Sequence, residues 1–268
     1  MFGFSQAQAS GWGSPVTLAC VVAGAVLLVV FILVENRVAS PLLPLRVVFE
    51  KVRGGSLLGI TLGGMGTLSV WLFLTYYFQQ VLGYSAIKAG FAFLPFSAGI
   101  VAGAMLSSQL LPRIGPRPLM TSGFLLAAAG LVLFTQVGAH SGYVAHLLPA
   151  EIMVSLGMGT AFVPLSSTAL IGIEPSDAGV ASALVNTTQQ TGGALGVALL
   201  NTVAASATSG YLVSHHGGQS LFAAAAVHGY TTAFGISAAL LAGAAAVSVL
   251  LLRAQQSDLP NELDLIPA

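Results

Sequence analysis

Seven long apolar segments decide what this chain can fold into. An α-helix needs roughly 20 residues to cross a bilayer, and segments of about that length cover residues 15–34, 55–79, 89–111, 118–137, 147–171, 179–204 and 229–252. Only 6% of the residues are charged, whereas a soluble domain carries about 25%. So few charges cannot cover the surface of a water-soluble globule of this length. We therefore predict an all-α membrane protein with seven transmembrane helices.

The basic residues predict how these helices are oriented, because cytoplasmic loops carry an excess of Lys and Arg. Of the eight basic residues, Lys88 alone falls on one side of the predicted topology. The others share the opposite side: Arg37, Arg46, Lys51, Arg53, Arg113, Arg117 and Arg253. We expect a multi-pass protein of the plasma (inner) membrane, embedded in the lipid bilayer, with its N-terminus outside and its C-terminus in the cytoplasm.

Several classes of function are disfavoured by composition and motifs. The net charge is zero, which argues against nucleic acid as a partner. The sequence has no phosphate-binding glycine loop and no zinc-binding cysteine pairs. His215, His216 and His228 have no nearby carboxylate or cysteine to complete a metal site, so we favour a solvated loop for them. We expect no metal, no cofactor and no enzymatic activity.

A polar stretch, NTTQQTGG from Asn186 to Gly193, lies within the sixth apolar segment. On a helix, Asn186, Gln189 and Gln190 share one face, while each threonine can bond a carbonyl of its own helix. Hydrocarbon offers the three amides no partner. They either pack against amides or carbonyls of neighbouring helices or form one wall of a wet substrate cavity.

Glu151 is the one acid within a predicted membrane helix. Intramembrane acids are functional hypotheses by default. Glu151 falls about one turn from the outer surface, where a carboxylate can reach the headgroups or cap the helix N-terminus, and we favour that interfacial interpretation. Tyr76, Tyr77 and Phe78 fall at the same depth and are expected to be interface anchors.

The last six segments suggest an internal repeat. SAIKAG, ending at Gly90, precedes the third segment, and PSDAG, ending at Gly179, precedes the sixth, 89 positions later. Glycines at helical spacing follow both. Because three helices separate the copies, they enter the membrane from opposite sides, as in an inverted-topology repeat of three plus three helices.

The connection PRIGPRP, Pro112 to Pro118, breaks the run between the third and fourth segments. It resembles the degenerate second copy of the cytoplasmic signature of the major facilitator superfamily, G-x-x-x-D-R-x-G-R-[RK]. Arg113, Gly115 and Arg117 match that pattern, whereas Pro112 stands at the position of the Asp.

Three further stretches resemble the 14-helix drug:proton antiporter branch of that superfamily: residues 41–49, 76–95 and 177–200. The likeness covers a linker helix and the C-terminal six-helix domain. It implies an outer segment, linker helix and cytoplasmic linker over 1–53, a transporter domain over 54–252 and a cytoplasmic tail over 253–268. The N-terminal six helices, which carry the acids linked to proton coupling in this branch, are then a missing partner half.

The resemblance implies a partial exporter of hydrophobic or cationic small molecules that works by alternating access and is driven by the proton gradient. Segments 118–137 and 229–252 are then expected to face lipid. The implied substrate-cavity candidates are Asn186, Gln189, Gln190, Trp71, Tyr76 and Phe162. Gln189 departs from the Arg that is frequent in this branch. Arg113 and Arg117 are implied either at a cytoplasmic gate or as topology anchors.

Two alternatives belong to other classes. A seven-helix receptor fits the number of helices, although no lysine follows Lys88 to bind retinal as a Schiff base. A non-transporting accessory or assembly subunit also fits a chain that resembles half of a transporter.

Overall fold

The computed structural model describes residues 14–35, 51–139, 141–171, 173, 178–215 and 220–251, and every element within these ranges is helical. The elements are α2 (Pro15–Glu35), α4 (Lys51–Tyr76), η1 (Tyr77–Val81), α5 (Ala86–Ala92), α6 (Leu94–Ile114), α7 (Pro116–Phe134), η2 (Tyr143–Leu147), α8 (Leu148–Ala169), α9 (Ala178–Ser214) and α10 (Ser220–Leu250). Some of these elements continue into the next, as α4 does into η1, α5 into α6, and η2 into α8. Counted in this way, the described residues contain seven helices that are long enough and apolar enough to cross a membrane. The predicted fold class and number of spans are confirmed. Six features named above lie outside the described residues: Arg37, Arg46, segment 41–49, Asp177, His216 and Arg253.

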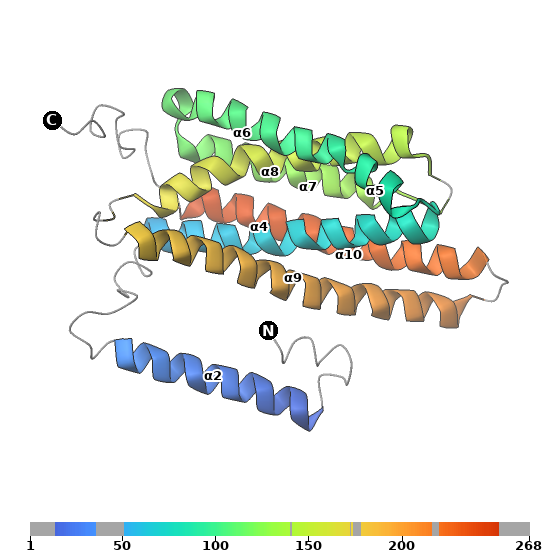
Figure 1. The fold of residues 1–268 in the computed structure, drawn as a ribbon, viewed down its shortest axis with the longest axis horizontal. Helices are drawn as coiled ribbons and strands as arrows, with labels where there is room; N and C mark the ends of the chain where they lie inside the picture. The colour runs from blue at the N-terminus through green and yellow to red at the C-terminus, as the bar shows by residue number, and fades with distance from the viewer. Residues whose placement is uncertain are drawn as a thin grey trace.

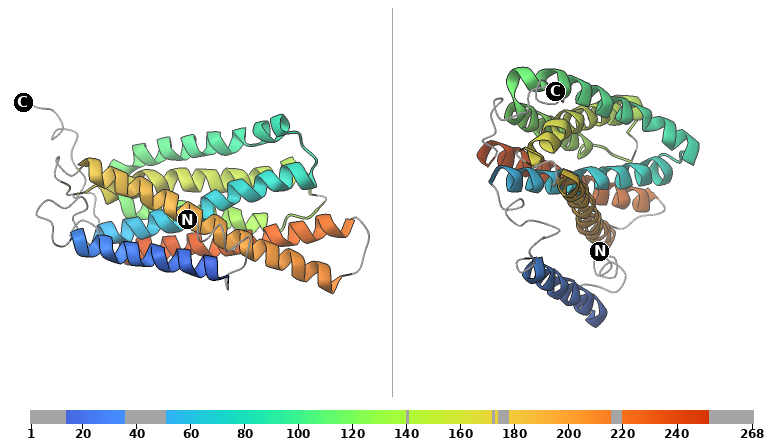
Figure 2. Two further views of the ribbon diagram at one scale, coloured as in Figure 1. Left: turned by 60° about the horizontal axis from the view of Figure 1, so that its bottom comes forward. Right: turned by 60° about the vertical axis from the view of Figure 1, so that its left-hand side comes forward.

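Six of the seven helices form one bundle (Figure 1). Helix α8 packs between α6 and α7, while α4 packs against α9, and α10 contacts α4, α7 and α9. Figure 2 shows the same bundle from two further directions, with α6 and α9 on opposite sides of it. The core that holds these helices together is rich in aromatic side chains, including Phe73, Phe96, Phe124 and Phe134, none more than 1% exposed.

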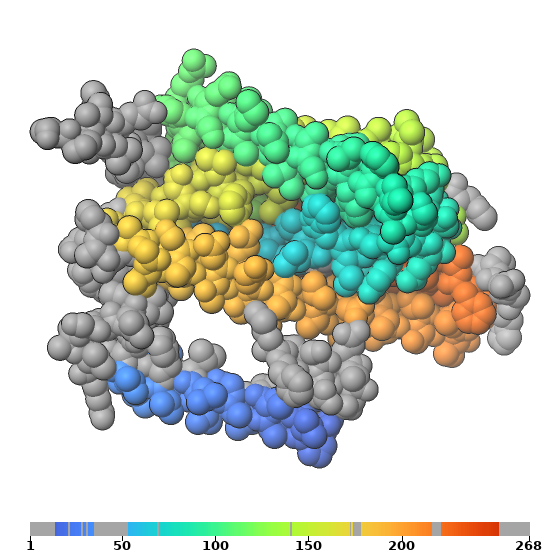
Figure 3. Space-filling view, in the orientation of Figure 1, coloured from blue at the N-terminus to red at the C-terminus, as the bar shows by residue number. Residues whose placement is uncertain are grey.

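Helix α2 stands apart from the bundle. Figure 3 shows open space along much of its length, and its apolar side chains are exposed, with Leu27 at 68% and Val22 at 59%. A helix that is hydrophobic and exposed on all sides is stable in lipid but not in water. The interpretation of this segment as a linker helix stays a prediction.

The last two helices are longer than predicted. Helix α9 continues to Ser214 and α10 begins at Ser220, so most of the expected loop between them is a helical hairpin that projects beyond the bundle (Figure 1). Hydropathy reports affinity for the bilayer, whereas alanine, abundant in the α10 extension, promotes helix formation in any solvent. His228 therefore belongs to α10, and its ring lies 5.1 Å from that of Tyr211.

The PRIGPRP connection is shorter than predicted. Helix α6 continues through Pro112 to Ile114, α7 begins at Pro116, and Gly115 alone separates them. Gly115 has a φ of +79°, a conformation that glycine adopts without strain. Pro116 is tolerated at the first position of α7, because the N–H that proline lacks would have no partner within the helix.

One end of the bundle, which we name the η end, is built from η1, α5 and η2. Here Tyr77 and Phe78 are buried, at 2% and 0% exposure, so the expectation that they are interface anchors is wrong. The Tyr77 hydroxyl donates to the Gly138 carbonyl at 2.8 Å. Aromatic rings at the end of a predicted span pack inward here because the π-helical turn η1 redirects them into the bundle.

The two copies of the repeat make matching contacts. A Cβ placed on Gly103 of α6 would meet the Leu156 carbonyl of α8, and one placed on Gly192 of α9 would meet the Thr61 carbonyl of α4. Gly103 and Gly192 are 89 positions apart, the same offset as SAIKAG and PSDAG. Small residues allow this close backbone approach between membrane helices.

The central helices show the same correspondence at an offset of 95 positions. A Cβ on Gly159 of α8 would meet the Ile100 carbonyl of α6, and one on Gly64 of α4 would lie 2.8 Å from the Gln189 carbonyl oxygen of α9. Ile100 and Gln189 are again 89 positions apart. The α6–α8 and α9–α4 interfaces therefore share these glycine–carbonyl contacts at equivalent positions, as expected for an inverted repeat.

Candidate functional site

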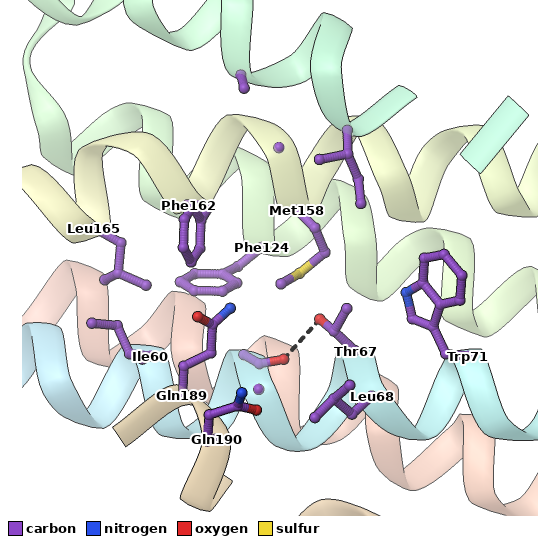
Figure 4. Close-up of a pocket in the computed structure, with 15 residues that line it drawn as sticks. Ile60, Thr67, Leu68, Trp71, Phe124, Met158, Phe162, Leu165, Gln189 and Gln190 are labelled. Atoms are coloured by element: carbon purple, nitrogen blue, oxygen red, sulfur yellow. Dashed lines mark hydrogen bonds between the residues drawn. The ribbon is translucent and has the colours of Figure 1, made fainter. Parts of the chain in front are cut away.

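A cavity of about 400 Å³ lies between the two interfaces, within the size range of small-molecule sites. Its lining residues come from five helices: Ile60, Gly63, Gly64, Thr67, Leu68 and Trp71 of α4, Ile100 and Ala104 of α6, Phe124 of α7, Met158, Gly159, Phe162 and Leu165 of α8, and Gln189 and Gln190 of α9. Figure 4 shows these side chains around the opening.

The cavity lies where the two copies of the repeat meet. Four pairs of equivalent positions line it together: Gly63 with Met158, Gly64 with Gly159, Thr67 with Phe162, and Ile100 with Gln189. In transporters built from inverted repeats, the substrate site lies at the interface between the copies. The cavity of this chain lies at the corresponding place, between the two copies.

The walls are mainly apolar and aromatic. The rings of Phe162 and Phe124 lie next to each other (Figure 4), and Met158 lies beside them. Gln189 points from α9 toward these rings. Thr67 donates its hydroxyl hydrogen to the Gly63 carbonyl at 2.8 Å, which leaves the hydroxyl oxygen as an acceptor.

No acidic or basic side chain is among the described residues that line the cavity. The polar side chains that line it are the amides of Gln189 and Gln190 and the hydroxyl of Thr67. A cationic group on a ligand would find ring faces and amide oxygens here, but no carboxylate.

Four of the six predicted cavity residues come together, namely Trp71, Phe162, Gln189 and Gln190. Asn186 and Tyr76 are not among the lining residues. Asn186 is exposed, and its Nδ2 donates to the Ser182 carbonyl of its own helix at 3.1 Å. Tyr76 lies nearer the η end, with its ring 6.3 Å from that of Tyr230.

Sequence reasoning missed Phe124, Met158 and Thr67. Phe124 belongs to the fourth segment, which was expected to face lipid, yet it is fully buried and reaches the cavity from α7. An apolar side chain on an apolar helix carries no signal that separates a cavity wall from a lipid-facing surface.

Glu151 forms a second polar site at the η end. It is fully buried, so the interpretation that it reaches the headgroups is wrong. Its Oε2 lies 3.1 Å from the Tyr143 hydroxyl, which is also 2.7 Å from the Ala92 carbonyl oxygen. Its Oε1 is buried without a hydrogen-bond partner. The π-helical turn η2, which precedes α8, is what brings Tyr143 back over this carboxyl.

In the described part of the chain, no group of three or more His, Cys, Asp or Glu residues is placed to hold a metal ion. Nor does any pair of acids or bases converge on the cavity there.

Comparison with known proteins identifies the family. Residues 4–197 match the family model of the Major Facilitator Superfamily. The chain belongs to this superfamily. Its members are membrane transporters rather than enzymes, and this membership also decides against a seven-helix receptor.

Several relatives of this superfamily member are named for drug resistance or export. A puromycin resistance protein of Streptomyces alboniger is 42% identical over 273 residues, covering 100% of this chain and 54% of the relative. A cephamycin export protein of Amycolatopsis lactamdurans is 38% identical over 220 residues, covering 80% of this chain and 45% of the relative. A tetracenomycin C resistance and export protein of Streptomyces glaucescens is 31% identical over 208 residues, covering 77% and 38%. The chain thus spans about half or less of the length of these relatives.

Arginines secure helix ends at the other end of the bundle, opposite the η end. Arg53, 5% exposed, donates from Nε to the Ala169 carbonyl at 3.2 Å and from a terminal nitrogen to the Ile171 carbonyl at 2.7 Å. Arg117 of the superfamily signature is exposed and donates to the Val249 carbonyl near the end of α10. A cation at a helix C-terminus is favoured by the helix dipole. Arg113 is exposed in the last turn of α6.

Proposed function

We propose that this chain is the C-terminal half of a proton-coupled exporter of hydrophobic or cationic small molecules, of the 14-helix antiporter branch. The observation that carries the proposal is the cavity at the repeat interface, with aromatic walls and the amides of Gln189 and Gln190. The names of the relatives support export of drug-like compounds.

The proposal assigns half of the substrate path to this chain. The cavity is bounded by one six-helix bundle only, and alternating access needs a second domain to rock against the first. The shares of the relatives that the chain covers, 54% and 45% for the two named first, fit a six-helix bundle with a linker helix. We propose that an N-terminal half supplies the facing wall and the proton-coupling acids.

The proposed orientation follows the basic residues. With the Arg53–Arg117 end in the cytoplasm, the η end faces outward, and the protein lies in the plasma membrane with an outer N-terminus. In this orientation Arg117 and the end of α10 lie at the cytoplasmic gate, where their contact holds α7 against α10.

The test is a chimera in which this chain replaces the matched 54% of the puromycin resistance protein. We expect cells that express the chimera to resist puromycin, because the cavity of this chain then faces an intact partner wall. A protonophore should abolish the resistance. Cells that express this chain alone should remain as sensitive as the empty-vector control.

Two outcomes decide against the proposal. Resistance from this chain alone would show that no partner half is needed. The matched control is a second chimera, in which the corresponding part of the cephamycin export protein replaces the same part of the puromycin resistance protein. If this control confers resistance, and the chimera with the present chain reaches the membrane at wild-type level but confers none, the accessory-subunit alternative is favoured.

A further inference from the structure

We infer that Glu151 is a proton-binding site whose occupancy is linked, through Tyr143 and the break between α5 and α6, to the wall of the cavity. The inference deepens the proposed function, on which it rests for the identity of the cavity. It places a proton-linked group in this half of the transporter.

The first step compares the single hydrogen of the Tyr143 hydroxyl with the oxygens that surround it. The Tyr143 hydroxyl has one hydrogen but lies within hydrogen-bond distance of two oxygens, 2.7 Å from the Ala92 carbonyl and 3.1 Å from Glu151 Oε2. The hydroxyl can donate its hydrogen to either oxygen, and the shorter distance favours the Ala92 carbonyl, which can only accept. The contact with Glu151 is then a hydrogen bond only if the carboxyl brings its own proton and donates it to the Tyr143 oxygen.

Burial supports the same protonation state. Glu151 is 0% exposed and its Oε1 has no partner, which is a costly environment for an ionised carboxylate. Packing does not require an acid here, because Ser56 occupies the equivalent position of α4, 95 residues earlier, and is equally buried. The acid therefore adds a chemical property that the repeat alone does not need.

Other titratable groups at the η end have partners of their own. Lys88 Nζ lies 3.8 Å from the centre of the Tyr84 ring, the Tyr77 hydroxyl donates to Gly138, and His146 Nδ1 is 3.4 Å from the Gly142 oxygen. The helices packed against α8 carry their other described charged residues at the opposite end: Lys51, Arg53, Arg113 and Arg117. Within the described residues, Tyr143 is thus the group that contacts the carboxyl.

A continuous series of ring contacts joins this site to the cavity. Tyr143 lies 5.8 Å from Phe78, Phe78 lies 5.3 Å from Phe93, and Phe93 stacks on the cavity residue Trp71 at 4.8 Å. Phe93 follows Ala92 directly, at the break between α5 and α6, where Pro95 lacks an N–H to continue the helix. The Ala92 carbonyl, which accepts from Tyr143, and the Phe93 ring, which stacks on Trp71, therefore belong to consecutive residues.

Loss of the proton changes these contacts in a defined order. The Tyr143 hydroxyl, which is partly exposed, releases its own hydrogen as a proton to water and takes up the Glu151 proton in its place. The resulting carboxylate accepts the hydroxyl hydrogen of Tyr143, and the Ala92 carbonyl loses that donor. The break between α5 and α6 is then free to shift, and Phe93 and Trp71 shift with it. Proton release thus alters the cavity wall.

The experiment follows the proton and Trp71 separately in the full chain. The sequence has two tryptophans, so Trp12→Phe leaves Trp71 as the single reporter. Infrared spectra in lipid nanodiscs record the C=O stretch of protonated carboxyls while the pH is raised, and fluorescence records the Trp71 emission. We expect one carboxyl band to disappear on alkalisation together with a shift in Trp71 emission.

Three variants assign the two signals. Glu151→Gln, whose amide imitates the protonated acid, should lose the band and hold Trp71 at its acid-side emission at every pH. Tyr143→Phe should keep the titrating band but lose the emission shift. Glu35→Gln, at the last residue of α2, should change neither. Circular dichroism and gel filtration establish that each variant is folded, and Tyr143→Phe, which removes one oxygen, serves if Glu151→Gln does not fold.

An emission shift that persists in Glu151→Gln, or the absence of a band that depends on Glu151, would overturn the inference. Persistence of the shift in Tyr143→Phe would overturn the link through Tyr143. If the puromycin chimera confers no resistance while the infrared and fluorescence signals are as expected, the proposed function is wrong and the proton-binding site is still supported.

Discussion

The α6–α8 and α9–α4 interfaces have the same backbone geometry and different chemistry. Both use a glycine of the outer helix against a carbonyl of the central helix, Gly103 in one and Gly192 in the other. Yet one pair of equivalent positions that line the cavity is Ile100 on α6 and Gln189 on α9. The glycine packing is the same in both interfaces, whereas the side chain at this cavity-lining position is apolar on α6 and an amide on α9.

A second pair of positions differs in the same interfaces. Ser107 donates to the Thr160 carbonyl at 2.9 Å, and its equivalent, Gly196, lies against the Met65 backbone. The α6 copy thus replaces close contact by a hydrogen bond at this level. The two copies thus keep their helices in contact at equivalent positions but use different interactions to do so, a side-chain hydrogen bond in one copy and glycine packing in the other.

The largest effect tests the shared geometry. Gly103→Ala and Gly192→Ala should each lower the free energy of unfolding by about 1–3 kcal/mol, because the added methyl overlaps backbone atoms. Thermal unfolding in detergent, followed by gel filtration, measures the loss.

The matched controls are Gly90→Ala and Gly179→Ala, where an added Cβ meets nothing within 4 Å. These should retain stability or gain up to about 1 kcal/mol. If only one member of the Gly103–Gly192 pair is sensitive, the two interfaces are not equivalent.

The next effect tests the difference in chemistry. Gln189→Ile, which gives α9 the side chain of α6, should weaken binding of rhodamine 6G to the purified puromycin chimera about tenfold, equal to about 1.4 kcal/mol. The loss reflects one hydrogen-bonding side chain. Fluorescence anisotropy of the dye gives the dissociation constant.

The reciprocal change, Ile100→Gln, should alter dye affinity less than about twofold, since it adds an amide without removing one. Equal losses in both variants would mean that shape alone governs the cavity, and the amide would have no special part.

A smaller effect is expected at Ser107. Ser107→Gly removes the hydrogen bond to Thr160 and should cost about 1 kcal/mol of unfolding free energy. The opposite change, Gly196→Ser, should be poorly tolerated, because a Cβ there would lie 2.7 Å from the Met65 carbonyl carbon. Melting temperatures of the two variants in the same detergent make the comparison, and a stable Gly196→Ser protein would contradict it.

The smallest effect concerns Asn186. Its equivalent on α6 is Ser97, and both are exposed. Asn186→Ser should therefore leave dye affinity within about twofold of wild type, because the amide bonds its own helix rather than the cavity. A loss as large as that of Gln189→Ile would place Asn186 back in the substrate path.

Much of the fold was predictable because membrane spans depend on length and hydropathy, which are local properties. The seven segments and the repeat marked by Gly90 and Gly179 needed no tertiary information. The extended ends of α9 and α10 did, since helix formation there continues beyond the apolar run. The π-helical turns η1 and η2 leave no trace in hydropathy, and they are what bury Phe78 and position Tyr143.

The candidate site was only partly predictable. A helical face could be assigned to Gln189 and Gln190, but the arc that contains them also contains Asn186, and only the neighbouring helices decide which members face the cavity. Phe124 shows the converse, because its apolar helix gave no reason to expect a cavity wall. Glu151 was recognised as unusual, while its burial depends on Tyr143 and the turn before α8.

The single-residue connection at Gly115 has a mechanical consequence. Two helices joined without slack cannot slide past each other along their axes, so a displacement of α6 at this end must carry α7 with it. Through Arg117, α7 is in turn fastened to the end of α10. Helices α6, α7 and α10 are therefore mechanically linked at this end of the bundle.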